Sequence, residues 1–335
     1  MRVWFNRHFS LLYRVLRLIR EADHAQRFTL LCTHKQPYFV GYAAAHEHAI
    51  EPVHLSTPDY VRWCLDFAIT HEVAVFVPTY EAEAMIAAQA QFAAHGIRVF
   101  TVADAETLPR LHDKAWVYRE MAGQVPLAES TTLEQPQALP AALDALWSQG
   151  VEACIKPTVS VYGKGFHRLM RPDALRRPLR GLTPQEWDTR YVRDGVCARQ
   201  LVLEYLPGHE FSVDCIGDAG RFVTGVVRKK SITTPTQLLD DHPELLAHAA
   251  ALVRHFQLSG LVNIQFKEDQ HGVPKLLEIN PRASGGVAMS CLSGINLPYL
   301  ALCGAIDGYA GLHIPSARLG LRVTEVGMPL VLSHD

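Results

Sequence analysis

The sequence has little of what marks disulfide-bonded, membrane-spanning or nucleic-acid-binding proteins. Its 7 cysteines are scattered and form no Cys-x-x-Cys pair, which predicts reduced thiols and a cytoplasmic location. No apolar run approaches the roughly 18–20 residues that a bilayer span requires. The formal net charge of −2 over 335 residues gives no electrostatic reason to bind nucleic acid. We therefore expect neither nucleic acid nor membrane as a partner.

Two glycine-rich nucleotide signatures and the common zinc motifs are also missing. The first turn reads Asn6-Arg7-His8-Phe9-Ser10 and has no glycine, which disfavours NAD binding through this part of the chain. No Gly-x-x-x-x-Gly-Lys-Ser/Thr loop occurs. The 17 histidines form no His-Glu-x-x-His motif. Their only local cluster, His46-Glu47-His48, is interpreted as a solvated helix face and not as a zinc site.

What is present indicates a globular protein that begins with an α/β domain. Hydrophobic residues make up 48% and charged residues 20% of the chain. Over the first 110 or so residues, short apolar strands alternate with helical stretches, a pattern typical of a doubly wound parallel sheet. The amphipathic stretch Ser10–Glu21 predicts a helix packed on that sheet, with Ser10 as its N-cap; a helix lying on an anionic membrane surface is the alternative. The expected strands are Val3–Phe5, Phe28–Cys32, Val73–Val77 and Ile97–Phe100, and the other expected helices are Tyr60–Thr70 and Glu81–His95.

The rest of the chain predicts an antiparallel α+β arrangement. Leu108–Met121 is expected to be a connecting helix, and Ala153–Lys156 a strand within a mixed segment up to Arg199. The strands expected after it are Leu201–Leu206, Glu210–Ile216 and Phe222–Val227, followed by a helix at Pro243–Phe256 and a terminal hairpin.

The hairpin carries the most informative residues, Leu276-Leu277-Glu278-Ile279-Asn280-Pro281-Arg282. Glu278 and Asn280 are two positions apart, so they share one face of a strand. In the preceding strand, Leu261–Phe266, Asn263 and Gln265 would lie on the same face if the hairpin, with its loop at Lys267–Lys275, is in register. An oxygen-rich face of this kind suits a divalent cation such as Mg²⁺; an ordinary exposed sheet face is the alternative.

A lysine and a glycine-rich loop follow the expected strand Ala153–Lys156. Lys156 ends the strand, and Gly163-Lys164-Gly165 lies shortly after it, beyond Val161 and Tyr162. Glycines let backbone N–H groups approach an oxyanion and let a loop move. Phosphate binding is one interpretation of this segment, and a plain surface turn is the other.

These motifs together resemble the ATP-grasp superfamily, most closely its carbamoyl-phosphate-synthetase-like branch of carboxylate-amine ligases. The resemblance rests on Asn263–Phe266 followed by Leu277–Arg282, on the spaced lysines and on the stretch Leu201–Glu210. Many family members carry an acidic residue where this chain has Gln265. The resemblance implies metal binding by Gln265, Glu278 and Asn280, phosphate contacts from Lys114 and Lys156, and catalytic stabilisation of the transferring charge by Lys156 and Arg282. It also implies a lid at Gly163, Lys164 and Gly165, adenine recognition by Glu204, Tyr205 and Leu206, and a ribose contact from Glu210. Arg228 and Lys229 end the expected strand Phe222–Val227, where they could reach either phosphate or the acyl substrate.

The resemblance also implies the organisation and activity of the chain. Residues 1–110 would form a Rossmann-like domain in front of the ATP-grasp fold, 111–200 a lid and 201–335 the part with the metal site. The expected activity is ATP- and Mg²⁺-dependent (or Mn²⁺-dependent) joining of a small carboxylate to an amine. A carbamoyl- or acyl-phosphate-forming enzyme and a catalytically silent regulatory protein are the alternatives, and a homodimer is compatible with the sequence. Arg7, His8, Thr33–Lys35 and Thr79–Glu81 are expected near the second substrate, because ligands gather beyond the carboxyl ends of parallel strands.

Overall fold

The computed structural model describes residues 1–160, 163–171, 173–327 and 329–332. The chain divides into two compact units. The first consists of Met1–Pro109, Ser212–Ile264 and Asn280–Asp335, and the second of Arg110–Phe211 and Gln265–Ile279. The boundaries expected at residues 110 and 200 stay a prediction.

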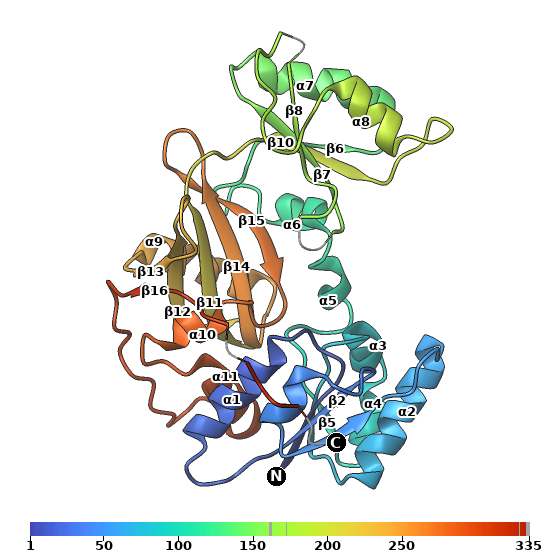
Figure 1. Ribbon diagram of the computed structural model, residues 1–335, viewed down its shortest axis with the longest axis vertical. Helices are drawn as coiled ribbons and strands as arrows, with labels where there is room; N and C mark the ends of the chain where they lie inside the picture. The colour runs from blue at the N-terminus through green and yellow to red at the C-terminus, as the bar shows by residue number, and fades with distance from the viewer. Residues whose placement is uncertain (161–162, 172, 328, 333–335) are drawn as a thin grey trace. The chain divides into compact units, whose positions relative to one another are not determined.

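The amino-terminal part of the first unit is the doubly wound parallel sheet that the sequence predicts (Figure 1). Its strand order is β3-β2-β1-β4-β5, and all the pairings are parallel. The strands are β1 (Arg2–Phe5), β2 (Thr29–His34), β3 (Glu47–Ile50), β4 (Val75–Val77) and β5 (Arg98–Val99). The helices are α1 (Leu12–Ala22), α2 (Thr57–Thr70), α3 (Ala82–Ala87) and α4 (Gln89–Ala93), with a 3₁₀ turn at Val40–Ala44.

Alternation along β1 explains why helices cover both faces of this sheet. Val3 and Phe5 belong to the core that includes Leu12 and Leu16 of α1. Trp4, which points the other way, belongs to a second core that includes Cys64 of α2. Each face therefore buries its own set of apolar side chains.

Several expectations for this domain were wrong in detail. Ser10 does not cap α1: the N-cap is Leu11 and no side chain caps it, because the chain turns into the helix one residue later, with Leu12 N–H donating to the Phe9 carbonyl. His46-Glu47-His48 is not on a helix, since residues from Glu47 onward pair with β2 as an edge strand. Backbone pairing to a neighbouring strand is a tertiary effect that local pattern does not reveal.

Two predicted helices are interrupted. Glu81–His95 is broken at Ala88 into α3 and α4. Leu108–Met121 divides into α5 (Thr107–Arg110) and α6 (Lys114–Glu120), because Asp113 caps α6 by accepting from the N–H groups of Ala115 and Trp116.

The large carboxy-terminal sheet has the strand order β15-β14-β11-β12-β13-β16. Its strands are β11 (Glu210–Asp218), β12 (Arg221–Lys230), β13 (Gln237–Asp240), β14 (Gly260–Glu268), β15 (Pro274–Asn280) and β16 (Arg322–Val323), accompanied by α9 (Pro243–His255), α10 (Val287–Cys291) and α11 (Leu297–Asp307). The expected hairpin is confirmed, with a shorter loop than Lys267–Lys275. That loop is closed by Asp269, whose N–H donates to the Val273 carbonyl. The short strands β13 and β16 were not expected.

The second unit contains a sheet of order β6-β10-β7-β8-β9, beside which α7 and α8 lie (Figure 1). Its strands are β6 (Ser130–Leu133), β7 (Ala153–Pro157), β8 (His167–Leu169), β9 (Gly181–Leu182) and β10 (Gln200–Glu204), and its helices are α7 (Leu139–Trp147) and α8 (Pro184–Tyr191), with a 3₁₀ turn at Pro136–Ala138. Leu143, Ile155, Trp187 and Val202 share one core. This core supports β7, which carries Lys156.

Among the described residues, no helix is both long enough and apolar enough to cross a bilayer.

Candidate active site

Two lysines and one carboxylate lie together in the second unit. The N–H of Lys114, at the start of α6, donates to the carbonyl of Thr158 at 2.9 Å, just beyond the end of β7. The Lys114 Nζ donates to the Ser160 carbonyl at 2.9 Å and lies 3.7 Å from Glu278 Oε2. Lys156 Nζ is 3.5 Å from the carbonyl of Leu277, the neighbour of Glu278. Residues far apart in the sequence thus present two cations beside one acid.

Burial lowers the pKa values of both lysines in this cluster. The pKa of Lys156 is lowered from its ordinary 10.5 to about 8, first by burial and second by the charge of Lys114. Burial also lowers the pKa of Lys114, and the carboxylate of Glu278 opposes that shift. An incoming polyanion would relieve the repulsion between the two ammonium groups and favour their charged forms. The cluster is therefore chemically suited to hold phosphates.

The described part of the glycine loop requires glycine at one position. Gly163 and Gly165 both have positive φ, 63° and 73°. A Cβ on Gly165 would lie 2.8 Å from ring atoms of Pro157, closer than real contacts allow. Lys164 between them is exposed. Val161 and Tyr162, which the predicted lid includes, lie outside the described residues.

A pocket with mostly apolar walls opens beside Lys156. Its lining residues come from α6, β7, β10, the hairpin strands and the loops next to these elements. They are Tyr118, Ala128, Cys154, Lys156, Phe166, Leu203, Glu204, Tyr205, Leu206, Lys267 and Leu277. All of them belong to the second unit. Apolar walls that include Lys156 suit a nucleotide, whose base is apolar on its faces and whose phosphates are charged.

The predicted adenine-binding residues lie in this pocket, but some of their polar groups already have partners. Both carboxylate oxygens of Glu204 accept from Lys275 Nζ at 2.8 Å, and one also accepts from Glu129 N–H at 2.8 Å. A carboxylate has about four acceptor positions, so one position of Glu204 remains. The N–H of Tyr205 donates to the Glu152 carbonyl at 2.7 Å. Leu206 is buried in the wall.

The three proposed metal ligands lie on the neighbouring strands β14 and β15. Gln265 is on β14, and Glu278 and Asn280 are on β15; all three side chains are half-buried. Asn280 Nδ2 donates to Asn263 Oδ1 at 3.3 Å, which turns the Asn280 carbonyl oxygen away from Asn263. Arg282 Nη2 donates to that oxygen at 3.3 Å. Two amides and one carboxylate are hard oxygen donors, and this donor set fits Mg²⁺ or Mn²⁺.

Glu210 and Arg228 differ in their surroundings. Glu210 begins β11 and is half-buried. Arg228 is 1% exposed, and its guanidinium contacts Asp214, Ser212, Ser284, Ser290 and Gln237. The expected contact of Arg228 with phosphate or the acyl substrate stays a prediction. These bonds favour a structural role, because the guanidinium would have to leave partners it already has.

Three residues that sequence reasoning missed belong to this region: Tyr118 and Lys267 line the pocket, and Lys275 binds Glu204 in its wall. Lys267 and Lys275 were placed in the hairpin loop, yet both belong to strands. Lys267 continues the period-two series that begins with Asn263 and Gln265, so a signal was present. Tyr118 follows Lys114 by four residues, one turn of α6, and its hydroxyl donates to the Leu276 carbonyl at 2.5 Å.

Comparison with solved structures identifies the fold. An ADP complex of N5-carboxyaminoimidazole ribonucleotide synthetase superposes with a TM-score of 0.69 at 13% identity, covering 96% of this chain and 80% of that one. Biotin carboxylase from Campylobacter jejuni gives 0.70 at 17% identity, covering 95% and 73%. An L-amino acid ligase from Bacillus licheniformis gives 0.65 at 11% identity, covering 94% and 77%. At these identities the likeness establishes the fold, which is the ATP-grasp fold.

A sequence family described as "ATP-grasp in the biosynthetic pathway with Ter operon" matches residues 197–329. This match covers less than half of the chain and includes the terminal hairpin; together with the fold it supports the resemblance that the motifs suggested. Among curated proteins, none matches the sequence significantly.

Proposed function

We propose that this protein is an ATP-dependent, ADP-forming ligase that activates a small carboxylate as an acyl phosphate and transfers the acyl group to an amine. The observation that carries the proposal is the pair of lysines beside Glu278: Lys114 Nζ lies 3.7 Å from Glu278 Oε2, and Lys156 lines the apolar-walled pocket. Enzymes of the same fold that act on carboxylates support it, among them the L-amino acid ligase.

Each residue of the cluster has a role in this proposal. Lys114 and Lys156 hold the nucleotide phosphates and neutralise their charge. Gln265, Glu278 and Asn280 would hold the cation. Bound Mg²⁺ supplies Lewis-acid neutralisation of phosphate oxygens. Arg282, which donates to Asn280 and to the Ala283 carbonyl, stands at the end of β15 where a planar fork of donors can contact a transferring phosphoryl group.

The chemistry requires positioning more than covalent participation by the protein. A substrate carboxylate oxygen attacks the γ-phosphorus of ATP, and the bond to the bridging oxygen of ADP breaks. The amine then attacks the acyl carbon, phosphate leaves with the bonding electrons, and the amine loses a proton to solvent. The cations of the site compensate the charge that accumulates on phosphate oxygens in the first step.

Measuring ADP and phosphate release tests the proposal. The wild-type protein is incubated with ATP and Mg²⁺ and a panel of amino acids and small carboxylates, offered singly and in pairs. We expect release that requires a particular pair and is lost in Glu278→Ala. Glu134→Ala serves as the control, because Glu134 is an exposed glutamate of the second unit that pairs with Arg199.

Three outcomes separate the alternatives. Release that needs a pair supports a ligase and identifies both substrates. Release with a single carboxylate would replace the ligase with an acyl-phosphate-forming enzyme, and the same measurement with bicarbonate alone identifies a carbamoyl-phosphate-forming one. ATP binding without release for any pair would contradict catalysis and favour a regulatory protein.

A further inference from the structure

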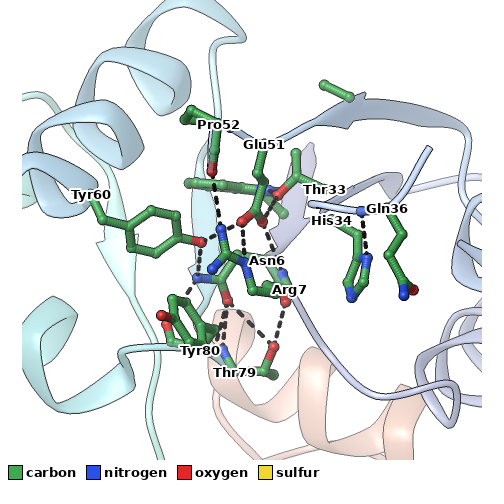
Figure 2. Close-up of polar contacts among 12 residues, drawn as sticks. Asn6, Arg7, Thr33, His34, Gln36, Glu51, Pro52, Tyr60, Thr79 and Tyr80 are labelled. Atoms are coloured by element: carbon green, nitrogen blue, oxygen red, sulfur yellow. Dashed lines mark hydrogen bonds and ion pairs between the residues drawn. The ribbon is translucent and has the colours of Figure 1, made fainter. Parts of the chain in front are cut away.

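A second polar cluster lies at the carboxyl ends of the parallel strands in the first unit, and the proposed nucleotide site does not use it (Figure 2). At its centre Glu51 is 2% exposed. Its carboxylate accepts from Arg7 N–H at 3.0 Å and Nε at 2.8 Å, from Thr33 Oγ1 at 2.7 Å, and from Tyr60 OH at 2.9 Å. Four donors fill the acceptor positions of one carboxylate, so Glu51 fixes its neighbours and does not itself contact a ligand.

Arg7 is held in one orientation by this cluster. Its guanidinium carbon lies 5.0 Å from the ring centre of Tyr60 and 4.3 Å from that of Tyr80. Nη2 donates to the Pro52 carbonyl at 3.2 Å. Within the part of the chain that the structure describes, Nη1 has no acceptor, and the side chain is 16% exposed. One edge of a rigid guanidinium thus retains unused donors.

Asn6, the residue before Arg7, holds Tyr60 and the turn at Thr79 and Tyr80 in place. Its Nδ2 donates to the Tyr80 carbonyl at 2.9 Å and to Tyr60 OH at 3.0 Å, while its Oδ1 accepts from Thr79 N–H at 2.7 Å. These bonds tie the turn after β1 to the turn after β4 (Figure 2). The arrangement is built before any ligand arrives, which lowers the cost of binding one.

The position of Arg7 in the sheet is the one where an open α/β sheet binds ligands. From β1 the chain proceeds to β2 and β3 on one side, and β4 lies on the other side of β1. The strand order therefore reverses between β1 and β4, and Arg7 follows β1 while Tyr80 follows β4. Ligands of such sheets bind beyond the carboxyl ends of the strands at this reversal.

His8, the residue after Arg7, adds another hydrogen-bond donor to the turn that follows β1. His8 is 8% exposed, and its Nδ1 accepts from Phe9 N–H at 2.6 Å. Burial, followed by the charge of Arg282, lowers its pKa to about 4, so the ring is neutral and its proton resides on Nε2. No described residue accepts from that Nε2.

We propose that the turn after β1 is a substrate subsite in which Arg7 binds a free carboxylate of the amine or acid substrate. Donors without accompanying acceptors select an anion over an amine. The charge of Arg7 is balanced by Glu51, so the subsite suits a singly charged carboxylate better than a doubly charged phosphate. The inference rests on the proposed ligase function and adds the class of substrate, a molecule with a free carboxylate besides the reacting group, such as an α-amino acid.

The test compares each of the twenty L-amino acids with its C-terminal amide by calorimetric titration into the Glu278→Ala protein, so that binding is measured without turnover. We expect at least one amino acid to bind at least tenfold more tightly than its amide, and Arg7→Lys to abolish that preference while leaving the binding of the amide unchanged. Arg62→Lys, an exposed arginine of α2 paired with Asp59, is the matched control and should keep the preference.

Removing Arg7 would leave Glu51 buried and unpaired, so stability needs its own control. The double variant Arg7→Met with Glu51→Gln removes both charges together, and a thermal melt establishes whether it is folded. When it is folded, it should show the same loss of preference as Arg7→Lys. Retention of the preference in a folded double variant would overturn the proposal.

Other outcomes also overturn the subsite. They are equal binding of every amino acid and its amide, no binding of any amino acid, and tighter binding of glycerol 3-phosphate than of every amino acid. Failure of the ligase proposal is recognised separately, because carboxylate-selective binding that depends on Arg7 would persist in a protein that releases no ADP with any substrate pair.

Discussion

The buried contacts of Arg228 support a quantitative prediction about stability. Arg228 and Asp214 have side chains 2% and 0% exposed, with Arg228 Nη2 2.9 Å from Asp214 Oδ2. The guanidinium also donates to Ser290 Oγ and Ser284 Oγ, each at 2.8 Å, and to Ser212 Oγ at 3.0 Å. These bonds join β11, β12 and the segment around α10 within the first unit.

Replacing Arg228 with methionine removes the cation and keeps most of the volume. Asp214 then retains only neutral donors, Ser290 Oγ at 2.6 Å and Asn263 Nδ2 at 2.9 Å. Leaving one member of a buried ion pair without its partner costs about 3–5 kcal/mol. We expect the free energy of unfolding to fall by that amount, because Asp214 cannot reach water at this site.

Urea denaturation followed by tryptophan fluorescence measures the change. Arg221→Ala is the matched control, since Arg221 lies on the same strand and forms an exposed pair with Asp218, with side chains 59% and 40% exposed; such pairs contribute about 0–1 kcal/mol. Asp214→Asn added to Arg228→Met should recover part of the loss by removing the unpaired charge. If Arg228→Met cost no more than Arg221→Ala, the reasoning about buried charge would be refuted.

Three further predictions concern Lys156, Gln265 and the packing around Arg228. Lys156→Met should stabilise the free protein below pH 8 by up to about 3 kcal/mol, because the wild type then buries a charge. Since the pKa of Lys156 in the folded protein is about 8 and its ordinary value is 10.5, the stability of the wild type should rise relative to the variant between these two pH values. A difference in urea midpoint that does not change with pH would contradict this. Gln265→Glu adds a negative charge to the proposed metal site and should lower the Mg²⁺ concentration for half-maximal ADP release several-fold; an unchanged Mg²⁺ dependence would show that Gln265 is no ligand. Gly286→Ala would place a Cβ 2.5 Å from Arg228 Nη1 and should cost about 1–3 kcal/mol, whereas Gly285→Ala, with nothing within 4 Å of its Cβ, should cost less than half as much by the same urea assay.

The strands of the first domain and the terminal hairpin were predictable from sequence, because their apolar residues follow simple periods. Val3–Phe5 and Val73–Val77 are instead short continuous apolar runs, whose length and valine content favour a strand buried on both faces. The edge strand from Glu47 to Ile50 carries no such signal, since its pairing with β2 is what makes it a strand. The ATP-grasp fold followed from motifs spaced over much of the chain, and the structures of the same fold confirm it.

The candidate site also contains residues that the sequence could identify and residues that it could not. Lys156, Glu278 and Lys114 could be selected because each occupies a motif position, and the structure brings them together; their roles stay predictions. The residues that hold the site residues in place by hydrogen bonds or ion pairs could not be identified from sequence. Lys275 binds Glu204, at a separation of 71 residues, and nothing local to either residue indicates that pairing. Contacts of this kind depend on strand order, which a single sequence does not specify.

The lowered pKa of Lys156 has a consequence for the thermodynamics of nucleotide binding. Near pH 8, about half of the unliganded molecules carry a neutral amine at this position. A triphosphate next to the amine would favour its charged form, so binding would draw a fraction of a proton from the buffer. The measured enthalpy of binding would then vary linearly with the ionisation enthalpy of the buffer, and the slope would count the protons taken up. The protein would thus couple nucleotide occupancy to the surrounding proton concentration through a single side chain.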